Sequence, residues 1–130
     1  MTPSEIITED SKQSGDDADI VLRKIHKLLE GKAGVLVQKN NSVMLLIGIA
    51  KAVAEIHFFI ADDSTKLKNS MAQFAKELKN SELKAVYGSV EKNQNPILKD
   101  ALEFLAKTEL NIKKSNVPRY AWMAQLKGNI

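Results

Sequence analysis

The feature that most constrains this chain is an apolar stretch at 43–61 that is long enough to be mistaken for a membrane span. Lys51, Glu55 and His57 interrupt it, and charged side chains are costly at the centre of a bilayer. The short segment at 50–52, which contains Lys51, also divides the stretch into two runs of strand length. The sequence therefore predicts two consecutive buried strands and no membrane span, although 50–55 alone also fits a helical pattern.

Hydrophobic periodicity and turn residues divide the rest of the chain into helices and strands. The predicted elements are a helix at 18–30, strands at 35–38, 43–49 and 53–61, a helix between the caps at 62–65 and 80–81, a strand at 83–90, a helix that starts at 95–96, and strands at 109–113 and 120–126. Short connections between the first three strands predict an antiparallel meander. A strand, a helix and a strand in succession predict a parallel crossover. The predicted fold class is therefore α/β, with a mixed sheet flanked by about three helices.

Residues 1–17 are acidic and show no clear periodicity, so we expect a flexible leader ahead of a single domain at 18–130. Residues 1–19 carry a net charge of −5, which leaves +8 on the rest of a chain whose net charge is +3. Such a leader stays solvated, becomes ordered on a neighbouring subunit, folds back electrostatically onto the basic body, or occupies a surface that otherwise meets an anion. It lacks the apolar segment of a secretory signal, and the chain has no cysteine, so a cytoplasmic location is expected.

One segment carries a resemblance to a known family. It is YGSVEKNQNPILKDALEFL at 87–105, in which Asn95 and Pro96 form a strong helix start. An asparagine-capped helix after a strand, followed by a strand pair, resembles the GNAT superfamily of N-acetyltransferases. The order of elements over 20–127 is similar to that of the family from its second strand onward. The resemblance implies a GNAT-like fold, in which an active member seats acetyl-CoA in a V-shaped gap between the strands at 53–61 and 83–90.

Two departures from that family bear on function. The family binds pyrophosphate in a glycine-containing loop at a helix N-terminus, where backbone amides can approach phosphate closely. The corresponding segment here, DDSTKLKN at 62–69, has no glycine and begins with two aspartates. Phe104 stands where many members keep a tyrosine that protonates the departing thiolate. We therefore expect no bound cofactor.

The same resemblance assigns candidate site residues in case the chain is active. Glu55 and His57 project from one face of a strand and would form the base that takes the ammonium proton, with Tyr87 or Tyr120 replacing the missing tyrosine. The implied cofactor-binding residues are Ser64, Lys66, Lys68, Asn69 and Asn95. In the alternative interpretation, Glu55 and His57 are a partly exposed pair that only stabilises the sheet.

Other kinds of chemistry find little support. The two histidines are 31 positions apart and form no metal-ligand pattern, so we expect no metal, and we expect His26 to be exposed. The lysines are spread without interleaved aromatic residues, so a nucleic-acid partner is not expected. Trp122 is predicted to lie in the core, whereas an exposed Trp122 would mark a partner surface.

The sequence leaves two main functions open. The first is a non-catalytic structural or interaction protein on an acetyltransferase-like scaffold, with protein partners or self-association, motivated by the missing glycines and the acidic leader. The chain also resembles small degenerate members of the superfamily from tailed bacteriophages, which implies a virion component. The second function is an active acetyl-CoA-dependent N-acetyltransferase. A peptide- or nucleic-acid-binding module of unrelated α/β topology is a further alternative.

Overall fold

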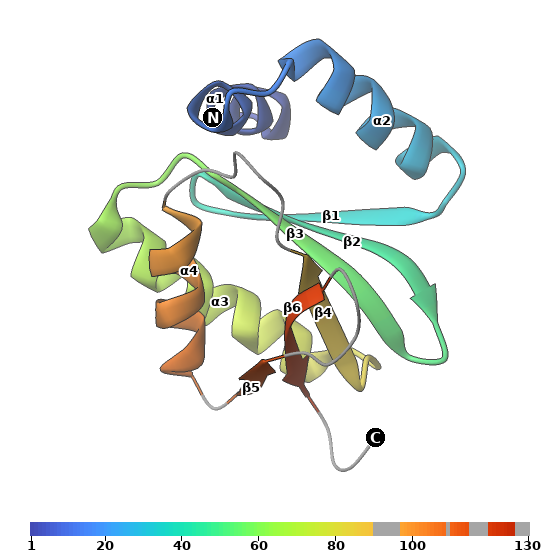
Figure 1. Ribbon diagram of the computed structural model, residues 1–130, viewed down its shortest axis with the longest axis vertical. Coiled ribbons are helices and arrows are strands. Elements are labelled where there is room, and N and C mark those ends of the chain that lie inside the picture. Colours follow the sequence, from blue (N-terminus) through green and yellow to red (C-terminus); the bar gives the residue numbers. More distant parts are fainter. Residues whose placement is uncertain (90–96, 109, 115–119, 127–130) are drawn as a thin grey trace.

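The computed structural model describes residues 1–89, 97–108, 110–114 and 120–126, and it has the predicted α/β composition (Figure 1). The elements in chain order are α1 (Pro3–Ser14), α2 (Ala18–Glu30), β1 (Gly34–Lys39), β2 (Ser42–Ala50), β3 (Val53–Ile60), α3 (Ser64–Asn80), β4 (Ala85–Ser89), α4 (Leu98–Ala106), β5 (Asn111–Lys114) and β6 (Tyr120–Gln125). Asn95 and Pro96, the predicted start of α4, lie outside the described residues.

The six strands form one mixed sheet in the order β1-β2-β3-β4-β6-β5. β1, β2 and β3 pair antiparallel in succession, so the predicted meander is confirmed. β3 and β4 pair parallel with α3 between them in the chain, so the predicted crossover is confirmed as well. β6 lies between β4 and β5 and runs antiparallel to both.

Helices cover both faces of this sheet (Figure 1). α3 and α4 cover one face, where the larger core cluster gathers around Met71, Phe74 and Leu105. α1 and α2 pack on the other face, over β1, β2 and β3, and enclose a smaller cluster around Ile7 and Ile25. The apolar stretch at 43–61 thus forms two adjacent strands, as predicted, and no helix in the described part of the chain is long and apolar enough to cross a membrane.

The N-terminal helix corrects one prediction, because residues 3–14 form α1 where a flexible leader was expected. Thr2 caps this helix, and its side chain and backbone exchange hydrogen bonds with Glu5 in a capping box. These bonds hold the pKa of Glu5 below its ordinary value. Ile6 and Ile7 are 0% and 1% exposed against the sheet. In the part of the chain that the structure describes, the sheet is accordingly flanked by four helices instead of about three.

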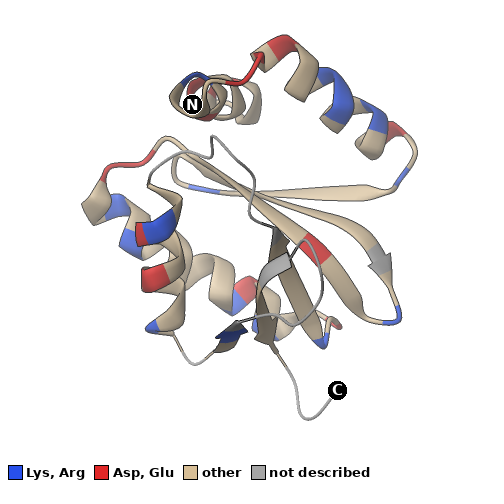
Figure 2. Ribbon diagram, viewed as in Figure 1, with Lys and Arg blue, Asp and Glu red and all other residues tan. Residues whose placement is uncertain are grey.

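The second helix follows its predicted bounds, and the acidic residues before it explain where it begins. The Asp17 side chain accepts hydrogen bonds from the backbone amides of Asp19 and Ile20. Figure 2 shows this acidic link between α1 and α2, while lysine and arginine residues are spread over α2, α3 and α4. His26 is exposed on α2, as predicted.

Candidate functional site

The predicted base pair lies on β3. The Nε2 atom of His57 is 3.2 Å from Oε1 of Glu55, so the two side chains project from one face and meet. Their side chains are 24% and 22% exposed, respectively. The geometry of a carboxylate-supported imidazole is therefore present, and its catalytic role stays a prediction.

Tyr87, the third catalytic candidate, lies opposite Glu55 on the neighbouring parallel strand β4. Residues paired in this way project from the same face of a sheet. The three candidates Glu55, His57 and Tyr87 are thus brought together on one face, which is the face on which α1 and α2 pack over β1 to β3.

β3 and β4 are paired over a short segment only. In the described residues, pairing joins Val53–Ile56 of β3 to Ala85–Gly88 of β4 and does not extend further along β3. The GNAT resemblance implies a cofactor gap between these two strands, so the side chains that line this gap decide what the site can hold.

Aromatic side chains fill one side of the gap. The rings of Phe58 and Trp122 lie nearly parallel, and their centroids are 6.4 Å apart. The ring centroids of Phe58 and Phe74 are 5.7 Å apart. Trp122 lies over Gly88 so closely that a Cβ there would be 1.8 Å from the indole Nε1. Gly88 therefore has to be glycine to admit this ring, and Trp122 is buried as predicted.

A side chain from α1 binds the edge of β3 that lies beyond the described pairing with β4. The amide of Ala61 donates to Asn41 on the β2 side, so the preceding amide, that of Ile60, points to the opposite edge. There it donates to Oδ1 of Asp10 at 3.0 Å, and Asp10 is only 7% exposed. The N-terminal segment therefore folds back onto the sheet, with Asp10 bound to a backbone amide of β3.

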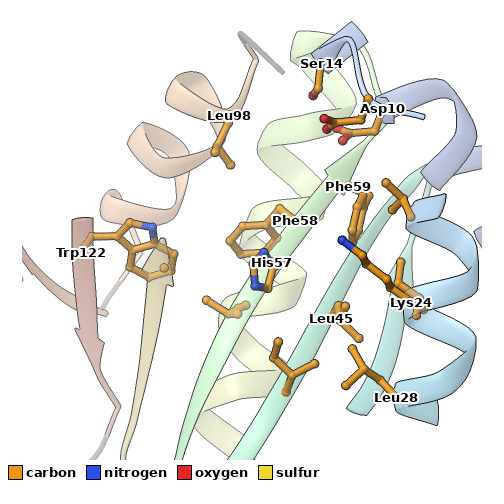
Figure 3. Close-up of a pocket in the computed structure, with 16 residues that line it drawn as sticks. Asp10, Ser14, Lys24, Leu28, Leu45, His57, Phe58, Phe59, Leu98 and Trp122 are labelled. Atoms are coloured by element: carbon orange, nitrogen blue, oxygen red, sulfur yellow. The ribbon is translucent and has the colours of Figure 1, made fainter. Parts of the chain in front are cut away.

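A cavity of about 310 Å³ connects these features (Figure 3). Asp10 and Ser14 lie at its α1 end, and Phe58 and Trp122 lie on the side of β6 and α4. His57 lines this cavity, whereas Glu55 and Tyr87 do not. Its wall is mostly apolar, with these residues: Asp10, Ser14, Asp16, Val21, Lys24, Ile25, Leu28, Leu45, Ile47, Ile56, His57, Phe58, Phe59, Gly88, Leu98 and Trp122.

The predicted cofactor residues gather elsewhere, around the first two turns of α3. Asp63 caps this helix by accepting a hydrogen bond from the amide of Lys66 at 2.9 Å. Lys66 and Asn69 line a separate hollow of about 420 Å³ with residues of the β1–β2 turn, while Ser64 and Lys68 are exposed. Asn95 lies outside the described residues. In the described part of the chain, the catalytic and cofactor candidates therefore do not share a cavity.

Asp62, the first of the two aspartates in this segment, points into the protein and not toward the N-terminus of α3. It is 5% exposed and accepts hydrogen bonds from the Asn41 amide and from the hydroxyl groups of Ser42 and Ser70, at 3.1, 2.8 and 2.7 Å. Its charge is thus used to join the β1–β2 turn to α3, and only Asp63 faces outward. No group of three or more potential metal ligands occurs among the described residues.

Comparison with protein-family models, with curated proteins and with solved structures finds no match to this chain.

Proposed function

We propose that this chain is a non-catalytic interaction protein on an acetyltransferase-like scaffold. The antiparallel meander, the parallel β3–β4 pair and the parting of these strands support the scaffold part of the proposal. A virion component of a tailed bacteriophage remains the predicted biological setting.

The observation that carries the non-catalytic part is the filling of the gap between β3 and β4. Coenzyme A presents amide groups that would pair with a strand edge, and a thioester that must reach the base. Here Asp10 takes the amide of Ile60 on that edge, and Trp122 stacks beside Phe58 where the strands part. A carboxylate at this edge also repels an anionic ligand. The cavity that remains, about 310 Å³, is at the small end of the roughly 300–1,000 Å³ range of ligand pockets.

The diphosphate end of the ligand would meet a second obstacle at α3. A helix N-terminus binds phosphate through unpaired backbone amides. Asp63 already accepts from one of these amides, and no glycine in 62–69 lets the backbone approach a ligand closely.

Isothermal titration calorimetry with acetyl-CoA tests the proposal. We expect no binding heat at millimolar cofactor. Micromolar binding that Lys66→Glu or Lys68→Glu weakens, while Lys76→Glu on an exposed, later turn of α3 leaves it unchanged, would refute the non-catalytic function.

One observation favours an active N-acetyltransferase as the second candidate. His57 lines the cavity and meets Glu55 at 3.2 Å, so a base is in place should an acyl donor enter. Acetyl transfer to an amine that is lost in His57→Gln, with the fold retained, would support this candidate.

A further inference from the structure

β1 forms one edge of the sheet, and no described strand pairs with its outer side. β1 is the first strand in the order, so only its β2 side is paired. The carbonyl of Ala33 accepts from the amide of Gly48 on that side, at 3.3 Å. Because backbone groups alternate along a strand, odd-numbered residues of β1 bond to β2. Gly34, Leu36 and Gln38 therefore present their N–H and C=O groups to the outer edge.

This edge lacks the features that usually prevent strand pairing. Natural edge strands are short, carry charges or proline, or contain a bulge. β5, the opposite edge, is four residues long and ends in Lys113 and Lys114. β1 has six residues, an unbroken register with β2, and no charged residue or proline from Gly34 to Gln38.

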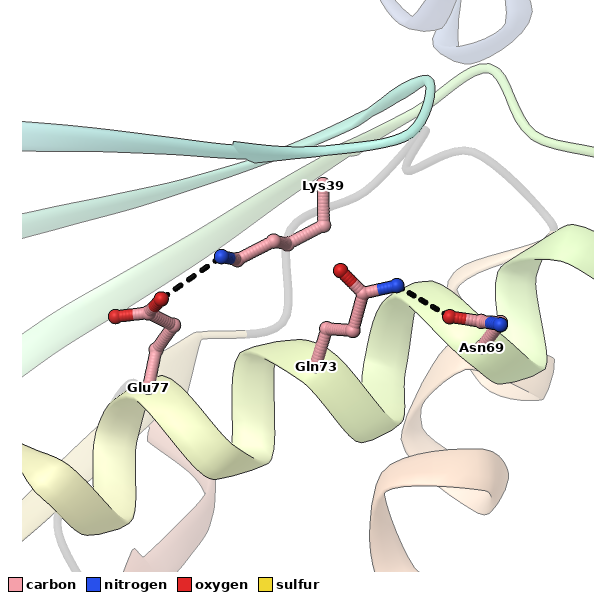
Figure 4. A network of polar contacts seen from close by, with 4 residues as sticks. All are labelled: Lys39, Asn69, Gln73 and Glu77. Carbon is pink, nitrogen blue, oxygen red and sulfur yellow. Dashed lines mark hydrogen bonds and ion pairs between the residues drawn. The ribbon is translucent and has the colours of Figure 1, made fainter.

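Two further observations make the β1 edge suited to contact. Val35 is 45% exposed, and only two other large hydrophobic side chains in the described ranges are similarly exposed. Lys39, the charge at the end of β1, is bound to Glu77 of α3 at 2.8 Å (Figure 4). On the same helix as Glu77, the side chain of Gln73 donates a hydrogen bond to the side chain of Asn69 (Figure 4). These two α3 side chains are therefore bound to each other.

We propose that the outer edge of β1 pairs antiparallel with β1 of a second copy of this chain. A twofold axis at Leu36 opposes Leu36 to its own copy and Gly34 to Gln38 of the second copy. All three outward-facing residues of each strand then exchange hydrogen bonds, six in total, as in an ordinary antiparallel ladder. The two sheets become one continuous sheet.

The second copy is the occupant because β1 is complementary to itself. In this register Val35 lies opposite Val37 of the other copy, on the face of the sheet away from α2, and this apolar pair occurs twice. β1 has no charged residue from Gly34 to Gln38, so the pairing brings no like charges together there. A second copy of the chain therefore supplies both the hydrogen-bonding edge and the apolar side chains that this pairing requires.

This inference rests on the interaction part of the proposed function and names its partner. The two can fail separately, since the mass of the protein in solution reports on β1 and cofactor calorimetry reports on the gap. Light scattering coupled to size exclusion, over a series of protein concentrations, measures the mass. We expect a concentration-dependent dimer.

Two variants test whether β1 forms the contact. Gln38→Pro removes an outward N–H without removing a hydrogen bond to β2, and Gln38→Ala is its matched control, since it deletes the same exposed side chain and keeps the N–H. Val35→Lys adds the charge that natural edges use. We expect Gln38→Pro and Val35→Lys to raise the dimer dissociation constant at least about tenfold, and Gln38→Ala to change it little. A monomer at every concentration, or a dimer unaffected by both variants, overturns the proposal.

A cross-linking experiment tests the register in the protein, which has no cysteine of its own. Chains carrying Val35→Cys are mixed with chains carrying Val37→Cys and oxidised. We expect a disulfide-linked dimer from the mixture and little from either variant alone, because only 35 and 37 lie directly opposite. Equal linkage in all three samples would overturn the Leu36-centred pairing.

Discussion

Asp62 and Glu55 are carboxylates at opposite ends of β3, and they have different surroundings. Asp62 follows β3, is 5% exposed, and accepts three hydrogen bonds that join the β1–β2 turn to α3. Glu55 lies near the start of β3, is 22% exposed at its side chain, and meets only His57 among the contacts described for it. The comparison teaches that burial with a full set of donors makes a carboxylate part of the fold, whereas partial exposure leaves it available for chemistry.

The largest effect that the comparison predicts is for Asp62→Ala. It leaves the buried hydroxyl group of Ser42 and the backbone amide of Asn41 without their acceptor, and it leaves Ser70 only the Lys39 carbonyl, at 3.3 Å. We therefore expect a loss of about 3–5 kcal/mol in the free energy of unfolding. Urea denaturation measures it. Asp63→Ala, which removes only a helix cap, is the control, at about 1 kcal/mol. Equal losses for both variants would erase the distinction between the two neighbours.

Asp10 is a second buried carboxylate, with a smaller expected effect. Asp10→Ala removes the acceptor for the Ile60 amide, and a loss of about 1–3 kcal/mol is expected in the same assay. Asp16→Ala changes an exposed acidic residue just after α1 and should cost less than about 0.5 kcal/mol. If Asp10→Ala were as mild as Asp16→Ala, α1 would not be fixed at the edge of β3 by this contact.

We expect Glu55→Gln to change the free energy of unfolding by less than Asp10→Ala does. The pair with His57 is partly solvated, and such pairs contribute about 0–1 kcal/mol. Thermal and urea unfolding of Glu55→Gln and His57→Gln should both stay within that range. A loss close to that of Asp62→Ala would mean that this pair is structural and would remove the main observation in favour of an enzyme.

The smallest effect belongs to Glu5, a fully exposed carboxylate held by its capping box. Because these hydrogen bonds put the pKa of folded Glu5 below its ordinary value, its stabilisation of α1 is present above that ordinary pKa and is lost as the pH falls through the folded pKa. The stability difference between the unmodified protein and Glu5→Gln should therefore shrink between pH 7 and about pH 3. Urea denaturation at the two pH values measures it, and a constant difference would contradict the assignment.

Much of the architecture could be predicted because its signals are local. The helix at 18–30 has a clear apolar stripe between an aspartate cap and Gly31, and the first reversal of the meander has the turn residues Asn40 and Asn41. The second reversal, at Lys51 and Ala52, has positive φ angles without a typical turn sequence, so its signal was weaker. α1 was missed because its buried face mixes Ile6 and Ile7 with polar residues, which blurs the helical period. Its one strong signal was Thr2-Pro3-Ser4-Glu5, a capping-box pattern with proline at the first helical position.

The candidate site was predictable only within a single strand. Period-two alternation along β3 placed Glu55 and His57 on one face, and the structure confirms this. The closing of the gap depends on contacts between distant segments, such as Trp122 over Gly88 and Asp10 on Ile60. A glycine inside a strand signals a close approach by another group, so Gly88 was the available clue.

Trp122 is the single tryptophan of the chain and lies in the gap itself, so its fluorescence tests the central claim most directly. If the protein's own side chains close the gap, emission excited at the red edge of the indole band is that of a buried ring, and millimolar acetyl-CoA leaves it unchanged. A saturable shift or quenching at micromolar acetyl-CoA would show that the ligand displaces or contacts the ring, and it would contradict the account.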